Sequence, residues 1–285
     1  MKTHLLKQLP LTQQERLEFI DFSLEFYGKV SRQWLSRCLQ LATASCTRDI
    51  TLYRQFASEN LEMRHHDKAF YRTDKFEALF VHKPRKTLAK LERYNPVLFP
   101  DVSSERSFSD VLIDNSMCYP SMDVTAAINR AIVSRSVVRI KYEGLKTGTI
   151  DTDLVPLIIF NGYRGWYVRA YDFSTAQFSD FSLSRIQSVA SCSGATPLPY
   201  ISADSEWNTI VSLSLQPHSA VLNKRAIEIM YGMKNGCLII ETNAVIGRHI
   251  LRRENVAISN NDLTDKDRLL TLKEALSCDL SFEEN

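Results

Sequence analysis

The sequence predicts a multidomain α+β protein with a winged helix-turn-helix at its N-terminus, a five-stranded β-barrel in the middle and a small α+β domain at its C-terminus. Its 285 residues exceed the roughly 100 to 150 residues of a usual domain. Apolar residues follow a helical spacing near the start and a strand pattern in the middle. Positive charge also gathers at the start: residues 1–94 carry 17 lysines and arginines against 11 acidic residues, and the remainder carries 18 against 22. This asymmetry is expected where one domain contacts a polyanion.

Three helices are predicted in residues 1–83, the segment assigned to the winged helix. The first follows a capping box at residues 12–15 and ends at Gly28. The second begins after Ser31, which can cap it, and the third covers residues 44–57. Two short strands at residues 61–64 and 69–72 are joined by a polar turn, and this basic hairpin is the predicted wing.

The third helix is predicted to read DNA. When Ile50 and Tyr53 face the core, Arg48, Thr51 and Gln55 lie on the opposite side, because successive residues turn by about 100°. An arginine there can form a bidentate pair with guanine, and the other two side chains can reach neighbouring base edges or phosphates. The predicted DNA-binding residues are Arg48, Thr51, Gln55, Thr47, Arg54, Arg32, Arg37, His65, His66 and Lys68, with Lys29, Arg64 and Arg72 as further phosphate contacts.

The rest of the chain is predicted to hold a linker and two further domains. Residues 84–121 are expected to form a linker with some helix, and a helix at about residues 123–134 introduces a domain assigned to residues 122–196. Five strands separated by turn residues predict a small barrel there, at residues 137–142, 154–161, 165–172, 177–183 and 186–191. In residues 197–285 we expect strands at 210–215 and 237–242 and helices at 219–231, 244–253 and 265–276.

Side chains alternate between two faces along the third strand of the barrel. Trp166 and Val168 share one face, and Tyr167 and Arg169 share the other. Arginine and tyrosine on one face can hold an anionic or stacked ligand such as a nucleotide. The alternative is a partly exposed strand whose long side chains cover the sheet.

Three stretches resemble one family of proteins. Residues 165–172, Gly-Trp-Tyr-Val-Arg-Ala-Tyr-Asp, and the following residues 178–186 resemble the WYL domain, an Sm/SH3-like barrel named for Trp-Tyr-Leu. Residues 47–50, Thr-Arg-Asp-Ile, followed by Tyr53, resemble the winged helix of the BrxR/CapW group of WYL regulators. Trp207 and residues 215–222 resemble the C-terminal extension of the same group.

This resemblance implies a homodimer formed through the C-terminal domain, and a repressor of a phage-defence-type operon. It also implies an effector, a nucleotide or nucleic-acid fragment, that is sensed through tyrosine and arginine side chains of the barrel. The predicted ligand-binding residues are Tyr142, Trp166, Tyr167, Arg169, Arg185, Lys141 and Ser182.

The leading hypothesis is therefore a homodimeric transcription regulator on double-stranded DNA with an inverted repeat. The alternative is a single-stranded nucleic-acid or RNA-binding module that acts through the barrel, with the helices serving in assembly. An enzyme is a third hypothesis, and the sequence offers it no P-loop, no G-x-S-x-G motif and no paired cysteine or histidine spacing for a metal. We therefore expect no catalytic residues, no metal and no cofactor. No apolar run has membrane-spanning length and no secretion signal is present, so we expect a cytoplasmic protein without a membrane partner.

Overall fold

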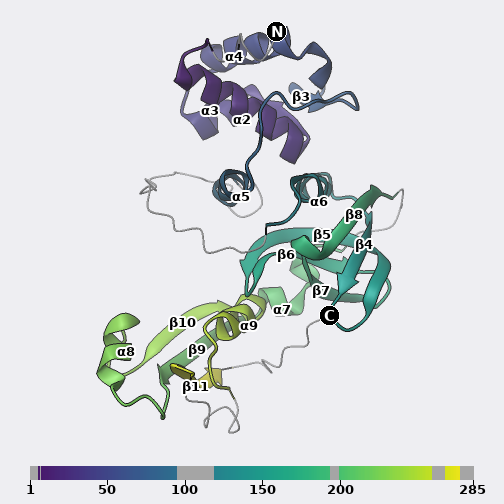
Figure 1. Ribbon diagram of the computed structural model, residues 1–285. Helices are drawn as coiled ribbons and strands as arrows, with labels where there is room; N and C mark the ends of the chain where they lie inside the picture. Colours follow the sequence, from purple (N-terminus) through teal and green to yellow (C-terminus); the bar gives the residue numbers. More distant parts are fainter. Residues whose placement is uncertain (1–5, 7, 95–118, 193–198, 259–266, 277–285) are drawn as a thin grey trace.

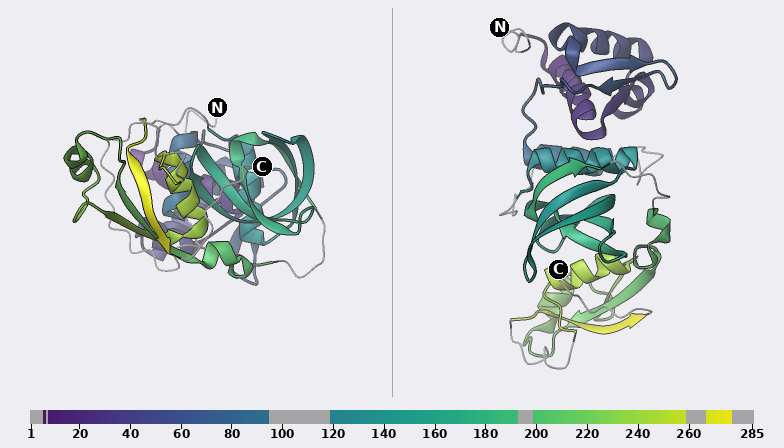
Figure 2. Two further views of the ribbon diagram at one scale, coloured as in Figure 1. Left: turned by 90° about the horizontal axis from the view of Figure 1, so that it is seen from below. Right: turned by 90° about the vertical axis from the view of Figure 1, so that its right-hand side faces the viewer.

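The computed structural model describes residues 6, 8–94, 119–192, 199–258 and 267–276. The domains follow one another in space as they do in sequence, with the winged helix at one end, a β-sheet domain in the middle and the C-terminal domain at the other end (Figure 1, Figure 2). Helix α6 (Met122–Ser134) lies between the winged helix and the central sheet in both figures. Within the described ranges, no helix combines the length and apolarity that a membrane crossing requires.

Residues 8–94 contain the predicted winged helix. Helices α2 (Leu11–Tyr27), α3 (Arg32–Leu39) and α4 (Thr43–Phe56) pack around one apolar core. Strands β1 (Lys29–Ser31), β2 (Leu61–Arg64) and β3 (Ala69–Arg72) form an antiparallel sheet in the order β1-β3-β2. The three predicted helices and the predicted hairpin are confirmed.

Two of the predicted helix boundaries are confirmed by their local geometry. Gly28 ends α2 in the left-handed conformation, with φ of 76°, and Ser31 caps α3 by accepting a hydrogen bond from the Trp34 amide at 3.1 Å. The predicted capping box is wrong, because α2 begins at Leu11 after Pro10 and no side chain caps it. Thr12 lies inside the first turn, whereas a capping side chain must come from the residue just before the helix, which is Pro10.

Helix α5 (Pro84–Arg93), at the start of the predicted linker, packs onto the winged helix. Leu88 and Leu91 are buried in the winged-helix core. The Tyr27 hydroxyl donates to the Tyr94 carbonyl oxygen at 2.9 Å, which ties the end of α5 to the end of α2. The rest of the predicted linker, from residue 95 to residue 118, lies outside the described residues.

The central domain is an antiparallel sheet with α6 packed on it. Its strands are β4 (Val138–Gly144), β5 (Gly148–Gly162), β6 (Gly165–Asp172), β7 (Gln177–Ser182) and β8 (Ile186–Ser191). In the described part of the chain they pair in the order β7-β6-β5-β4-β8, so β7 and β8 are the two edges. The five predicted strands are confirmed, and closure into an Sm/SH3-like barrel is not.

Two local features shape this sheet, an irregularity in β5 and a turn between β7 and β8. A register shift between Pro156 and Ile158 bends β5, at a proline that has no amide hydrogen for the ladder. A 3-10 turn at Leu183–Arg185 separates β7 from β8, and each pairs with a different inner strand. Ile140, Val168 and Phe181 are buried in the core between the sheet and α6.

The C-terminal domain contains α7 (Ser205–Asn208), β9 (Ile210–Pro217), α8 (Lys224–Met230), β10 (Leu238–Asn243), α9 (Ala244–Arg253) and β11 (Leu270–Leu276). Its sheet has the order β10-β9-β11 in the described residues, and all neighbours are antiparallel. Leu213 and Leu215 of β9 are buried with Leu251 of α9 in a core of their own.

One predicted helix of this domain is wrong. Residues 270–276 form strand β11, in which Leu270 pairs with Pro217 and Leu272 with Leu215. Lysine, glutamate and alanine in this segment favour a helix, but strand β9 offers an open row of backbone partners. Leu270 is fully buried by this pairing, so tertiary contacts override the local preference. Residues 265 and 266, also part of the predicted helix, lie outside the described residues.

Candidate nucleic-acid interface

Helix α4 has one buried and one exposed face, as helical spacing predicts. Ile50 and Tyr53 are 2% and 0% exposed and belong to the core. The exposed side chains are Thr47, Arg48, Thr51, Arg54 and Gln55. Arg48 Nη2 donates to Ser45 Oγ at 3.1 Å, an exposed contact that a nucleic-acid acceptor can replace. The helix lies at the outer end of the molecule, on the side of the winged helix away from α6 (Figure 1).

Buried polar contacts fix this helix to the rest of its domain. Asp21 of α2, which is fully buried, accepts a 2.5 Å hydrogen bond from the Tyr53 hydroxyl and a further bond from the Phe80 amide at 3.2 Å. Burial and the neighbouring Asp21 charge raise the pKa of Tyr53, so its hydroxyl stays protonated and remains the donor. Asp49 pairs with Arg16 at 2.8 Å on the same side of α4. The exposed face is therefore presented by a helix that is held rigidly from behind.

The wing carries further exposed basic residues. His65, His66 and Lys68 are exposed in the turn between β2 and β3, and Lys68 has a positive φ of 54°. The Tyr71 hydroxyl donates to Asp67 at 2.5 Å, and this bond is the main reason why the pKa of the Asp67 carboxyl is lowered. The Tyr71–Asp67 bond joins β3 to the turn and so stiffens the tip of the wing.

The other predicted basic residues are divided between the surface and internal contacts. Arg37 is exposed on α3, whereas the Nε atom of Arg32 is buried. Arg64 lies over the Tyr71 ring at 4.2 Å and pairs with Glu62 at 3.1 Å. Lys29 is 3.9 Å from Asp67. Arg72 turns toward Glu25 of α2 at 3.6 Å, away from the wing surface.

The residues predicted to bind a ligand in the central domain do not converge on one place. Tyr142 is fully buried beside Phe181, and its hydroxyl accepts from the Ser182 amide at 3.3 Å. The Arg185 guanidinium lies 5.0 Å from the centre of the Tyr142 ring, and Lys141 is exposed on the opposite face of β4. Tyr142, Ser182 and Arg185 therefore form one group, and Lys141 points away from it; Ser182 pairs with Tyr167 of β6 across the sheet.

The residues of β6 face two different domains. Trp166 packs against the apolar clusters of both the winged helix and the central domain. Tyr167, the next residue, is 3% exposed and packs with Val245 of α9, with its ring centre 4.7 Å from that of His249. Because successive side chains of a strand point to opposite faces, β6 contacts both neighbouring domains at once.

Arg169 is the centre of a buried charge cluster between the central sheet and the C-terminal domain. Its guanidinium donates to both carboxylate oxygens of Asp204, at 2.6 and 3.0 Å, to Asp180 at 3.1 Å and to Glu206 at 2.8 Å. Arg248 of α9 pairs with Glu206 through two bonds of 2.7 and 2.8 Å. The bonds from Arg248, with those from Arg169, lower the pKa of Glu206 to about 2. We call these five residues the Arg169 cluster.

No local pattern of residues predicts most of this cluster. Arg169 was predicted for its place on β6, but its partners Asp204 and Glu206 follow 35 and 37 residues later. Arg248 follows Glu206 by 42 residues. No local spacing rule pairs charges at such distances, so only the packing of α7 and α9 on the sheet brings them together.

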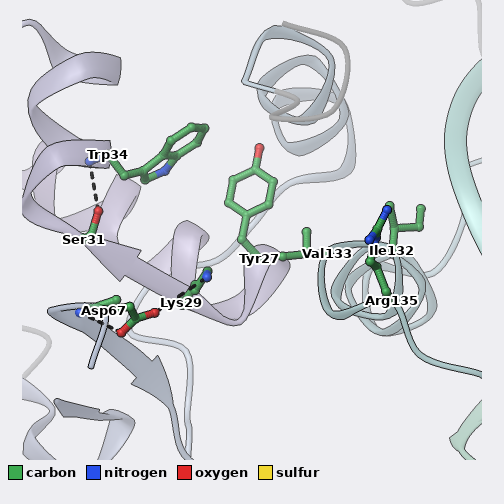
Figure 3. A pocket seen from close by; sticks show the side chains of 9 residues that line it. Tyr27, Lys29, Ser31, Trp34, Asp67, Ile132, Val133 and Arg135 are labelled. Atoms are coloured by element: carbon green, nitrogen blue, oxygen red, sulfur yellow. Dashed lines mark hydrogen bonds and ion pairs between the residues drawn. The ribbon is translucent and has the colours of Figure 1, made fainter. Parts of the chain in front are cut away.

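A cavity of about 490 Å³ lies between the winged helix and the end of α6. Figure 3 shows Trp34, Lys29 and Asp67 on one side of it and Ile132, Val133 and Arg135 of α6 on the other, with Tyr27 between the two groups. The seven residues predicted to bind a ligand are not among those that line it.

Comparisons with known proteins match the same three parts of the chain. Residues 12–91 match the BrxR transcriptional regulator winged helix-turn-helix domain, residues 123–191 the WYL domain, and residues 210–276 the BrxR transcriptional regulator C-terminal dimerization domain.

Relatives match over nearly the full length. The chain is 27% identical over 268 residues to the DNA-binding transcriptional repressor CapW of Pseudomonas aeruginosa, with 89% of this chain and 85% of that protein covered. It is 26% identical to CapW of Stenotrophomonas maltophilia, with 87% and 86% covered, and 24% identical to CapW of Escherichia coli strain KTE188, with 92% and 89% covered. The chain therefore belongs to the BrxR/CapW-like group of WYL-domain transcriptional regulators.

Proposed function

We propose that this chain is a cytoplasmic homodimeric repressor that binds an inverted repeat in the promoter of a phage-defence-type operon. The observation that carries this proposal is the exposed polar face of α4, with Arg48, Thr51 and Gln55 at the outer end of a rigidly held helix. Such a face fits the major groove, where arginine pairs with guanine and the smaller polar side chains reach adjacent bases. The exposed basic residues of the wing supply phosphate contacts beside it.

The second copy of the chain is proposed to bind at the C-terminal domain. Large apolar side chains are exposed there: Ile229 is 68%, Met230 65% and Ile239 65% exposed. Apolar surface of this kind is typical of a contact that another protein covers. A dimer formed at this end leaves both winged helices free to reach half-sites about 34 Å apart, one turn of DNA.

The effector is proposed to be a nucleotide or nucleic-acid fragment that acts through the WYL domain. Arg185 and Lys141 are the predicted cations on its surface, at half-buried and exposed positions. Tyr167 and Arg169 are 3% and 2% exposed, so a ligand reaches them only when the C-terminal domain moves away from β6. This burial also disfavours the alternative function, a module that binds single strands directly on β6.

Binding to the DNA upstream of its own gene tests the proposal. Fluorescence anisotropy with that DNA, and with a duplex of the same composition in scrambled order, should give a preference for the first that disappears in Arg48→Ala/Thr51→Ala. Each lost base contact is expected to cost about 1–3 kcal/mol of discrimination. The matched control Arg139→Ala changes an exposed arginine of the central domain and should bind as wild type does.

Two results of this titration would contradict the proposal. One is equal affinity for the upstream and scrambled duplexes. The other is an affinity that does not change with salt, because phosphate contacts release counterions and impose a slope of about −0.9 per contact on log K against log salt.

A further inference from the structure

The winged helix and the central domain meet where α6 crosses the C-terminal end of α2. Ala126 of α6 belongs to the buried apolar cluster of the winged helix, and Met122, Val133 and Trp166 pack against that cluster. Apolar burial of this kind is not directional. It holds the two domains together without fixing the angle between them.

Directional contacts at the same place come from two adjacent residues of α6. Asn129 Nδ2 donates to the carbonyl oxygen of Phe26 at 2.8 Å. Arg130 Nη1 donates to the carbonyl oxygen of Glu25 at 2.5 Å and to its carboxylate at 3.1 Å. Both carbonyls belong to the last turn of α2, where a helix has no internal donors left for its oxygens. The α6 side chains thus complete the hydrogen bonding of α2, and Arg130 places its charge where the helix dipole favours a cation.

Two further features adapt the end of α2 to this contact. Gly28 allows the chain to turn with φ of 76°, and the methylene groups of Arg130 lie 3.7 to 3.8 Å from where a Cβ at this glycine would be. The Glu25 carboxylate also faces Arg72 of β3 at 3.6 Å. One carboxylate is therefore contacted from both the wing strand and the central domain.

The cavity of Figure 3 shows where this contact ends. Ile132 and Val133, in the last turn of α6, line one side of this cavity of about 490 Å³, and Lys29 of β1 and Asp67 of the wing turn line another. The wing is thus not braced by α6 on that side. The hydrogen-bonded contact at Asn129 and Arg130 then has the main part in setting the angle of the winged helix.

We infer that Asn129 and Arg130 are positioning residues that set the angle of the winged helix and thereby the half-site spacing that the dimer accepts. This inference depends on the proposed function, since it requires DNA binding by a dimer. One base pair of additional spacing moves a half-site by about 3.4 Å along the DNA and turns it by about 35°. A dimer can distinguish such steps only when both recognition helices are held at a defined angle to the dimer body.

The test measures affinity for a series of duplexes that differ only in spacing. Half-sites are located by footprinting on the upstream DNA, and duplexes are made with the native spacing, with one, two or three base pairs added, and with a single half-site. The variants are Asn129→Ala/Arg130→Ala, the conservative Arg130→Lys, and the control Arg139→Ala, whose arginine lies on β4 and pairs with Asp153.

The wild-type dimer should lose about tenfold in affinity when two base pairs are added, because one helix then misses its groove. The Asn129→Ala/Arg130→Ala variant should lose less than about threefold in affinity when the same two base pairs are added, because a looser joint lets the winged helix follow the DNA. Its affinity for a single half-site should equal that of the wild type. Arg130→Lys should recover part of the spacing preference, and Arg139→Ala should keep all of it. A purely stabilising role would instead lower the melting temperature and weaken binding at every spacing equally.

Two results would overturn the inference, and a third would overturn the proposed function. A spacing preference that is unchanged in Asn129→Ala/Arg130→Ala overturns the inference, as does a wild-type protein that binds all spacings equally. If the wild type binds neither the native operator nor a single half-site, the proposed function itself fails, and the single half-site titration distinguishes that failure from the first.

Discussion

Replacing Arg169 should destabilise the contact between the central and C-terminal domains. The substitution Arg169→Met keeps most of the side-chain volume, so its effect is mainly the loss of charge and of four hydrogen bonds. Asp204, with 1% of its side chain exposed, is then left buried without its cation, whereas Asp180, 11% exposed, keeps His249 at 3.3 Å. Breaking a buried pair in this way costs about 3–5 kcal/mol. The contact with Glu206, whose side chain is 45% exposed, adds little because solvent screens it.

Scanning calorimetry measures this loss in the full chain. For a unit of about 150–250 residues, each kcal/mol lowers the melting temperature by about 2–4 °C, so we expect a fall of about 6–20 °C in the transition of the two domains. A chain with several domains can melt in more than one step, so the transitions are fitted separately. The control Arg139→Met removes an arginine whose side chain is 60% exposed and should change the melting temperature little.

A double-mutant cycle identifies the cause of the loss. Asp204→Asn removes the orphaned charge and keeps an oxygen that can accept from the Trp207 amide, as Asp204 does at 3.2 Å. In Arg169→Met/Asp204→Asn, part of the lost stability should therefore return, with a coupling within the roughly 0.5–3 kcal/mol known for contacting pairs. If Arg169→Met has the same melting temperature as the Arg139→Met control, the cluster does not hold the domains together and the reasoning is refuted.

The remaining predictions concern pH, the recognition helix and a turn. Because the pKa of Glu206 is lowered from 4.5 to about 2, its contribution to the free energy of unfolding is complete above pH 4.5 and lost as the pH falls toward 2. Over that window the free energy of unfolding of Glu206→Gln should change less with pH than that of the wild type, and parallel pH profiles would contradict this. Tyr53→Phe should cost about 1–3 kcal/mol in urea unfolding because it removes a buried donor to Asp21, whereas Tyr71→Phe on the wing should cost less; equal effects would count against the buried network. Gly28→Ala should lower the melting temperature measurably because alanine is strained at a φ of 76°, and an unchanged value would show that the turn relaxes.

Local patterns were sufficient to predict most secondary structure and the exposed face of α4. Helical spacing separated Ile50 and Tyr53 from Arg48 and Thr51, because both sets lie on one continuous helix. Both bounds of strand β6 were predicted, because turn residues flank it and its side chains alternate between two faces. In each case the information lies within a few residues of the element that it specifies.

The failures occur where distant segments decide the structure. Residues 270–276 became a strand because β9 had an unpaired edge, which the local composition does not reveal. Arg130 and Glu25 are 105 residues apart, and no rule of spacing predicts that they meet. Arg169 was predicted as a ligand-binding residue on the evidence of its own strand, but the acidic residues that surround it come from β7, from α7 and from Asp204, which caps α7.

The position of β6 has a physical consequence for how the domains communicate. Trp166 touches the winged-helix cluster, and three residues later Arg169 is held by the C-terminal domain. A buried ion cluster does not open one bond at a time, because each partial opening leaves an unpaired charge in a medium of low polarity. Moving the C-terminal domain away from β6 would therefore have to break the bonds of Arg169 to Asp204 and Glu206 together. An effector of the kind proposed above would bias such a contact only by binding the closed and the opened arrangement with different affinity.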